Sequence, residues 1–188
     1  SRLVSAERFV SDFRSTRTAT EIAAFAEAGE ISREIAERAF SNEVIEAGVT
    51  TVGDVRHFMY DELWRYGVGT WFQPDMRVQR QGMAEVGSRG FLAVAPEETV
   101  IEPGDLIHVD FGISYMGLDS DWQKMAYVLR PGEESAPAGL TAALANTNAL
   151  QDALTLRASR PGRTAGEAYA ATMAEMEAAG IVAQIYSH

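Results

Sequence analysis

Apolar residues recur at helical spacing in the first and last thirds of the chain and follow a strand-like pattern between them. Thr18 and Glu21 have the spacing of a capping box, which predicts a helix that begins there and runs to about Ala47. A second helix is predicted over residues 51–67, because apolar side chains recur on one face and a glycine follows them. Residues 68–129 carry short apolar and β-branched runs, which predict strands.

Turn residues divide the later part of the chain. Residues 102–105 (EPGD) have the proline-then-glycine order of a type II turn. Helical spacing returns over residues 140–154, and an Arg-Pro-Gly segment at 160–162 breaks it. A capping-box pattern that begins at Thr164 predicts one more helix, which ends near Gly180.

The two halves of the chain resemble each other. Residues 51–55 (TVGDV) match residues 164–168 (TAGEA) at an offset of 113 positions, and the same offset continues without a gap past the helix. Chance likeness between common helix-glycine-strand units is one explanation, and an internal duplication is the interpretation we favour. The first repeat then covers about residues 18–130 and the second about residues 135–188. The second copy is incomplete, so a sheet built from both copies lacks close to half its strands.

Composition narrows the chemistry. A net charge of −11 argues against binding to a phosphate backbone, and no apolar run is long enough to span a membrane. We therefore expect no nucleic acid and no membrane as partners, and a soluble protein for which a cytoplasmic location is favoured over export. The absence of cysteine excludes disulfides and thiol-based metal sites. With only three histidines, a metal site must depend on Asp and Glu.

Asp110 and Asp121 are the candidate metal ligands. Asp110 lies near the end of a predicted strand over residues 106–112, and Asp121 begins the next one. If the two strands form a hairpin in which these aspartates face each other, their Cβ atoms lie about 4.5–5.5 Å apart. When two carboxylates lie so near each other, either the pKa of one is raised or a cation lies between them. A pair of divalent ions could provide this positive charge. On spacing alone, two solvated surface acids are the simpler explanation.

The residues around the two aspartates favour the metal interpretation. Residues 100–112 (VIEPGDLIHVDFG), followed by Tyr115, Gly117 and residues 120–121, closely resemble the metal-binding hairpin of the pita-bread metallopeptidases. This family includes methionine aminopeptidase, prolidase, aminopeptidase P and creatinase relatives. Residues 14–22 (RSTRTATEI) resemble the opening of the prolidase-type catalytic domain, so the likeness extends along most of the chain.

The resemblance implies an α+β pita-bread fold, which is itself a pseudo-twofold duplication of helix-helix-strand units. It implies that Asp110 and Asp121 help to bind two divalent metal ions, for which manganese, cobalt, zinc and iron all suit oxygen and imidazole ligands. The family's other ligands, one His and two Glu, are expected beyond His188. His188 itself lacks the Gly-His-Gly context of the family's ligand and is not assigned this role.

Other polar residues near the motif have simpler interpretations. His108 should share a face with Asp110, and we interpret it as a packed, hydrogen-bonded sheet residue; a role behind the ligands is the alternative. Asp119 is interpreted as a turn acid and His57 as part of a solvated helix face. The aromatic residues Trp64, Tyr66, Trp71 and Phe72 are interpreted as core or interface. The segment around Trp71 also lacks the substrate-contacting His of prolidase-type relatives.

These observations favour a metal-dependent hydrolase of the Xaa-Pro dipeptidase or aminopeptidase type, which would cleave the N-terminal bond of short peptides with a metal-activated water. A creatinase-like hydrolase or lyase acting on a non-peptide compound is one alternative, and a non-catalytic protein-binding relative is another. We expect the parent protein to form a homodimer. With two ligands and an unfinished sheet, the 188 residues by themselves are expected to bind metal weakly and to lack peptidase activity.

Overall fold

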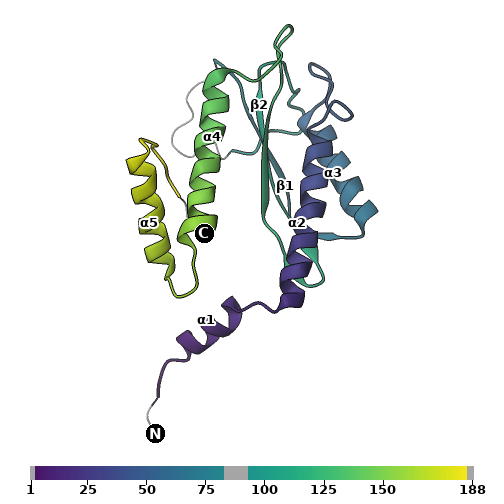
Figure 1. Ribbon diagram of the computed structural model, residues 1–188. Helices are drawn as coiled ribbons and strands as arrows, with labels where there is room; N and C mark the ends of the chain where they lie inside the picture. The colour runs from purple at the N-terminus through teal and green to yellow at the C-terminus, as the bar shows by residue number, and fades with distance from the viewer. Residues whose placement is uncertain (1–2, 83–92, 186–188) are drawn as a thin grey trace. The chain divides into compact units, whose positions relative to one another are not determined.

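The computed structural model describes residues 3–82 and 93–185, which form two compact units, Ser1–Glu133 and Glu134–His188. Over the described residues, the first unit contains three helices and a four-stranded antiparallel sheet (Figure 1). The described part of the second unit is helical.

Two of the three helices described in the first unit begin at a residue whose side chain caps their free amide groups. The three helices are α1 (Glu7–Ser15), α2 (Ala19–Ala39) and α3 (Val52–Tyr66). The predicted capping box of α2 is present, with Thr18 and Glu21 bonded reciprocally, and α3 has a second one at Thr51. Gly67 ends α3 in the left-handed conformation at φ 66°, as a glycine there predicts.

The helix α2 ends at Ala39, so the prediction that it continues to about Ala47 is wrong. Ser41 provides the physical reason. Its hydroxyl donates to the Arg38 carbonyl at 2.8 Å and accepts from the Glu43 amide at 3.2 Å. A serine side chain that bonds to nearby backbone groups competes with helical hydrogen bonds, and the chain turns through the following residues instead.

The sheet lies beside α2 and α3 in Figure 1. Its strands are β1 (Gly69–Gln79), β2 (Leu106–Tyr115), β3 (Leu118–Asp119) and β4 (Trp122–Tyr127), with β2 paired to all three others. The turn before β2 has the predicted geometry, because Gly104 adopts φ 97° and the Asp105 amide donates to the Glu102 carbonyl at 3.1 Å.

One face of β2 forms the core of the first unit. Its alternate residues Ile107, Val109, Phe111 and Ile113 are fully buried against apolar side chains of α2 and α3 such as Ile35 and Met59. Period-two alternation therefore places the remaining residues of β2, including His108 and Asp110, on the opposite face. The opposite face therefore carries the candidate metal ligand Asp110.

The second unit consists of α4 (Ala138–Asp152), the π-helical segment η2 (Ala153–Ala158) and α5 (Ala165–Ala178). Arg157 of η2 forms an ion pair with Glu175 of α5 at 2.7 Å. The helix α5 begins with a capping box at Thr164, as predicted, and Gly180 follows it with a positive φ of 68°. Thr164 and Gly180 stand 113 positions after Thr51 and Gly67, which have the same local geometry; the duplication itself stays a prediction.

Candidate metal centre

The hairpin that carries the two candidate ligands closes at Met116 and Gly117. Both residues have positive φ, 51° and 79°, and Tyr115 pairs with Leu118 on either side of them. Two central residues with positive φ define a type I′ turn, in which glycine suits the second position because it has no Cβ. The turn therefore centres between Met116 and Gly117, one residue later than the facing-aspartate hypothesis requires.

This turn changes the register that we predicted. Asp110 pairs with Gln123, so the expectation that it directly faces Asp121 is wrong. Asp121 lies two residues before Gln123, and a shift of two residues keeps a side chain on the same face of a regular ladder. The two aspartates are thus diagonal neighbours, for which a regular ladder gives about 7–8 Å rather than the shorter spacing of facing residues. Direct repulsion between the carboxylates is correspondingly weaker.

Asp110 already has a cationic neighbour. Arg77 Nη1 lies 3.4 Å from Asp110 Oδ2, and the two side chains are only 12% and 20% exposed. Arg77 comes from β1, where it faces His108, and β1 also places Asp75 directly opposite Asp110. Neither β1 residue was identified from the sequence, because their proximity to Asp110 depends on strand pairing across more than thirty residues.

His108 is a hydrogen-bonded sheet residue, as predicted. Its Nδ1 lies 2.9 Å from Arg77 Nη1, and its Nε2 lies 3.1 Å from Gln123 Oε1. A guanidinium can only donate, so Nδ1 accepts and Nε2 carries the proton that is donated to Gln123. Burial lowers the pKa of His108, and the positive charge of Arg77 acts in the same direction. The imidazole is therefore neutral and links Gln123 to Arg77, which in turn contacts Asp110.

The remaining candidates have separate surroundings. Asp119 lies beside the turn, where its carboxylate accepts from Ser114 Oγ at 2.6 Å, as expected for a turn acid. His57 is exposed on α3, as expected. His188 lies outside the described residues. Within residues 3–82 and 93–185, no three His, Asp or Glu side chains come together in a group that could hold a metal ion.

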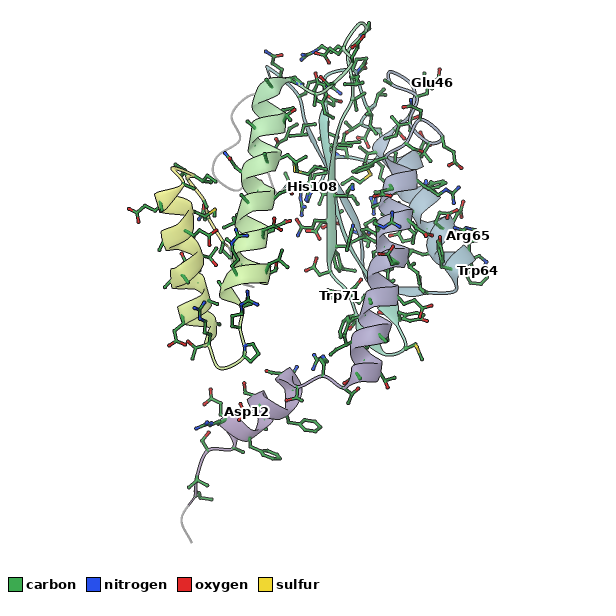
Figure 2. The ribbon with its side chains drawn as sticks, viewed as in Figure 1. Asp12, Glu46, Trp64, Arg65, Trp71 and His108 are labelled. Atoms are coloured by element: carbon green, nitrogen blue, oxygen red, sulfur yellow. The ribbon has the colours of Figure 1, made fainter. Side chains whose placement is uncertain are left out.

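The four aromatic residues that were predicted to be core or interface differ in how exposed they are. Tyr66 and Phe72 are partly buried, whereas Trp64 on α3 is 88% exposed and does not belong to the core. Trp71 is 54% exposed, and its indole N–H donates to the Ser120 carbonyl at 2.7 Å. Figure 2 shows Trp64 directed away from the sheet and His108 on the sheet itself. The indole of Trp71 is therefore joined to the residue that precedes Asp121.

Comparison with solved structures identifies the architecture as the pita-bread fold. The X-Pro aminopeptidase from Thermotoga maritima MSB8 superposes with a TM-score of 0.68 at 19% identity, over 92% of this chain and 45% of that one. The prolidase from Thermococcus sibiricus gives 0.66 at 19% identity, over 93% and 44%. The proline aminopeptidase P II from Yersinia pestis gives 0.66 at 23% identity, over 91% and 36%. The chain spans less than half the length of each.

The sequence profile of metallopeptidase family M24 matches residues 23–188, and the chain belongs to this family. A search among curated proteins gives no match. No helix in the described parts of the chain is both long and apolar enough to cross a membrane. The family and the fold agree with the resemblance carried by residues 100–121.

Proposed function

We propose that Asp110 and Asp121 are metal ligands of an Xaa-Pro peptidase, in which they share a site with ligands supplied from outside the described residues. The observation that supports this proposal is the register of β2 with β4, which puts Asp110 and Asp121 on the same face of one hairpin by alternation, in a chain of family M24. The Xaa-Pro preference is supported by the prolidase-like residues 14–22 and by the names of the solved relatives.

Asp110 supplies a partly buried carboxylate that Arg77 contacts at 3.4 Å. In the proposed site a metal ion would share this carboxylate with Arg77. Oxygen ligands of this kind suit manganese, cobalt, zinc or iron when a histidine completes the set. Two carboxylates alone form an incomplete site, so the proposal requires further ligands from outside the described residues.

The proposed chemistry is hydrolysis of the N-terminal bond of a short peptide. Two bound divalent ions would polarise the scissile carbonyl and make water acidic enough to attack at neutral pH. The contribution of this chain is to hold two carboxylates on a rigid hairpin. The linked side chains of Gln123, His108 and Arg77 then fix the orientation of the Asp110 carboxylate, as outer partners of metal ligands commonly do.

The test uses the full-length protein with Ala-Pro and with Xaa-Pro-Yaa peptides, after addition of Mn²⁺, Co²⁺, Zn²⁺ or Fe²⁺ in turn. We expect turnover with at least one metal and its loss in Asp110→Asn and Asp121→Asn. The matched control is Asp119→Asn, which removes an acid from the same hairpin at its turn and should retain activity. Absence of turnover with every metal would show that the peptidase assignment is wrong.

The same experiment separates the two alternatives. Metal binding without peptide hydrolysis would favour a creatinase-like reaction on a small non-peptide compound, and failure to bind metal would favour a non-catalytic relative. The isolated 188-residue chain provides a further comparison. With two of the expected ligands, it should bind Mn²⁺ more weakly than the full-length protein and show no peptidase activity. Equal affinity would contradict the proposal that ligands are supplied from elsewhere.

A further inference from the structure

The hairpin ladder is interrupted immediately before Asp121. Ile113 and Ser120 lie opposite each other, and a regular antiparallel pair at this position would exchange two backbone hydrogen bonds. Only one of them forms, from the Ser120 amide to the Ile113 carbonyl at 2.9 Å. The Ile113 amide instead donates to the Ser120 side-chain hydroxyl at 3.1 Å. The carbonyl of Ser120 is thereby released from the ladder.

Trp71 binds the released carbonyl. Its indole N–H donates to Ser120 O at 2.7 Å from the neighbouring strand β1. Thr70 and Phe72 pair with the consecutive residues Ile113 and Gly112, so Trp71 is the extra residue of a β-bulge. Bulges redirect a side chain relative to the regular alternation of a strand. The bulge is what allows the indole to reach across the end of β2 to Ser120.

Gly112 provides the space for this contact. A Cβ atom at position 112 would collide with Trp71 Nε1, with the Ser120 carbonyl oxygen and with the ring of Phe72. Position 112 lies two residues after Asp110 on the same strand, so this Cβ would stand on the face that carries Asp110. Thr70 Oγ1 of β1 also donates to the Gly112 carbonyl at 2.7 Å. The indole therefore lies over Gly112, beside the candidate site.

Ser120 is also held from the helix layer. The Ser32 hydroxyl of α2 is buried and donates to the Ala28 carbonyl at 2.8 Å, so its oxygen is left to accept from Ser120 Oγ at 3.4 Å. Backbone amide, hydroxyl and carbonyl of Ser120 thus each have a defined partner. Among these partners, Trp71 is the one that donates to the Ser120 carbonyl. This carbonyl is part of the peptide bond between Ser120 and Asp121.

We propose that Trp71 is a positioning residue for the second metal ligand: its indole N–H fixes the Ser120–Asp121 peptide and so sets the direction of the Asp121 carboxylate. Gly112 is required because any side chain there would displace the indole. The proposal rests on the proposed function, since it concerns how Asp121 is presented to a metal. It assigns to Trp71 no contact with substrate and no part in proton transfer.

The test compares Trp71→Phe with wild type in the full-length protein, using Mn²⁺ titration calorimetry and urea unfolding. Phenylalanine keeps an aromatic ring but cannot donate to Ser120. We expect Mn²⁺ affinity to fall roughly 10- to 100-fold, as is typical when an outer partner of a metal ligand is removed, while the urea midpoint of the metal-free protein stays close to wild type. Trp64→Phe is the matched control, because it makes the same change at the highly exposed tryptophan of α3 and should leave affinity unchanged.

A spectroscopic measurement supplies an independent criterion. The indole N–H signal of Trp71, identified by its loss in Trp71→Phe, should broaden on addition of a small amount of paramagnetic Mn²⁺ well before that of Trp64 does. Gly112→Ala should weaken Mn²⁺ binding in the same way, because the added methyl group pushes the indole from Ser120. If Trp71→Phe does not fold, calorimetry on Gly112→Ala still tests the role of the indole, since unchanged Mn²⁺ affinity in that variant would contradict it.

The outcomes that overturn the proposal are distinct from those that overturn the function. Unchanged Mn²⁺ affinity in Trp71→Phe, with normal binding by wild type, would overturn only the role of Trp71. A loss of folding stability without a loss of affinity in the folded variant would do the same, because it would indicate a merely structural contact. Failure of the wild-type protein to bind any of Mn²⁺, Co²⁺, Zn²⁺ and Fe²⁺ would overturn both.

Discussion

The two faces of β2 are built from alternating residues of one ten-residue strand, and they are held by different forces. Ile107, Val109, Phe111 and Ile113 are buried among the side chains of α2 and α3, where area removed from water provides the free energy. His108 and Asp110 on the other face are joined to Arg77 and Gln123 by directional polar contacts. Burial of the apolar face therefore stabilises the fold, and the residues of the polar face can be charged groups that contact one another.

The most damaging change should be on the apolar face. Phe111→Ala removes the largest fully buried side chain and leaves a cavity, so the free energy of unfolding should fall by about 3–5 kcal/mol. Urea unfolding followed by circular dichroism measures this loss. Ile107→Val, which removes one methylene from the same face, should cost only about 0.5–1.5 kcal/mol. A smaller loss for Phe111→Ala than for Ile107→Val would contradict the assignment of this face as the core.

A charged group within the helix layer should have an intermediate effect. Glu62 of α3 is buried and accepts from Arg65 at 2.6 Å and from Arg38 at 2.5 Å. Glu62→Gln removes the negative charge from these bonds, and the free energy of unfolding at pH 7 should fall by about 1.5–3 kcal/mol. Glu43→Gln is the control, because it changes an exposed carboxylate that also binds Arg38.

The effect of Glu62 should depend on pH with a definite sign. The hydrogen bond from Arg65, with the charge of Arg38, lowers the pKa of Glu62 below its ordinary value of 4.5. A carboxyl group whose pKa is lower in the folded chain stabilises the fold above its unfolded pKa, and this contribution is lost as the pH falls through the folded pKa. The difference between wild type and Glu62→Gln should be constant near neutrality and shrink below pH 4.5. A difference that persists in acid would show that the charge is not its cause.

The smallest change in stability should come from the polar face. Asp110→Asn weakens a largely buried ion pair with Arg77 at 3.4 Å, but it keeps an accepting oxygen and removes a negative charge from opposite Asp75. The free energy of unfolding should therefore change by about 1 kcal/mol or less. Its effect on metal binding should be large by contrast. Saturating Mn²⁺, at about 100 times its dissociation constant, should stabilise the full-length wild type by about 2.7 kcal/mol. Thermal unfolding with and without Mn²⁺ should show no such gain in Asp110→Asn, and a normal gain in His57→Gln.

Local signals allowed much of the helical structure to be predicted. The capping boxes at Thr18, Thr51 and Thr164 act within four residues of each helix start, so each is visible in the sequence. The end of α2 was missed, because the serine at position 41 competes for backbone groups through bonds that helical periodicity does not reveal. The helix α1 was not predicted at all. Its apolar residues Phe9, Val10 and Phe13 do recur at helical spacing, but the helix spans only nine residues and none of them is buried.

The candidate site was predicted in part. The motif around Asp110 identified both aspartates, and they remain on one face although their register was predicted two residues away from the observed one. An error of two residues does not change which face of the sheet a side chain is assigned to, because side chains alternate with a period of two. Arg77 and Trp71 could not be recognised, since each reaches the hairpin from β1 only after the strands pair, and Trp71 depends in addition on a bulge.

The sequence alone was enough to predict where α2, α3 and α5 begin, that residues 106–112 form a strand with His108 and Asp110 on one face, and which family's motif surrounds Asp110 and Asp121. These features depend on hydrophobic alternation and on residues close together in the chain. Only the tertiary structure decided that Arg77 pairs with Asp110 and that Trp71 takes the Ser120 carbonyl. The physical reason is that register, bulges and hydrogen-bond partners between strands are fixed by packing between distant residues, which no local pattern specifies.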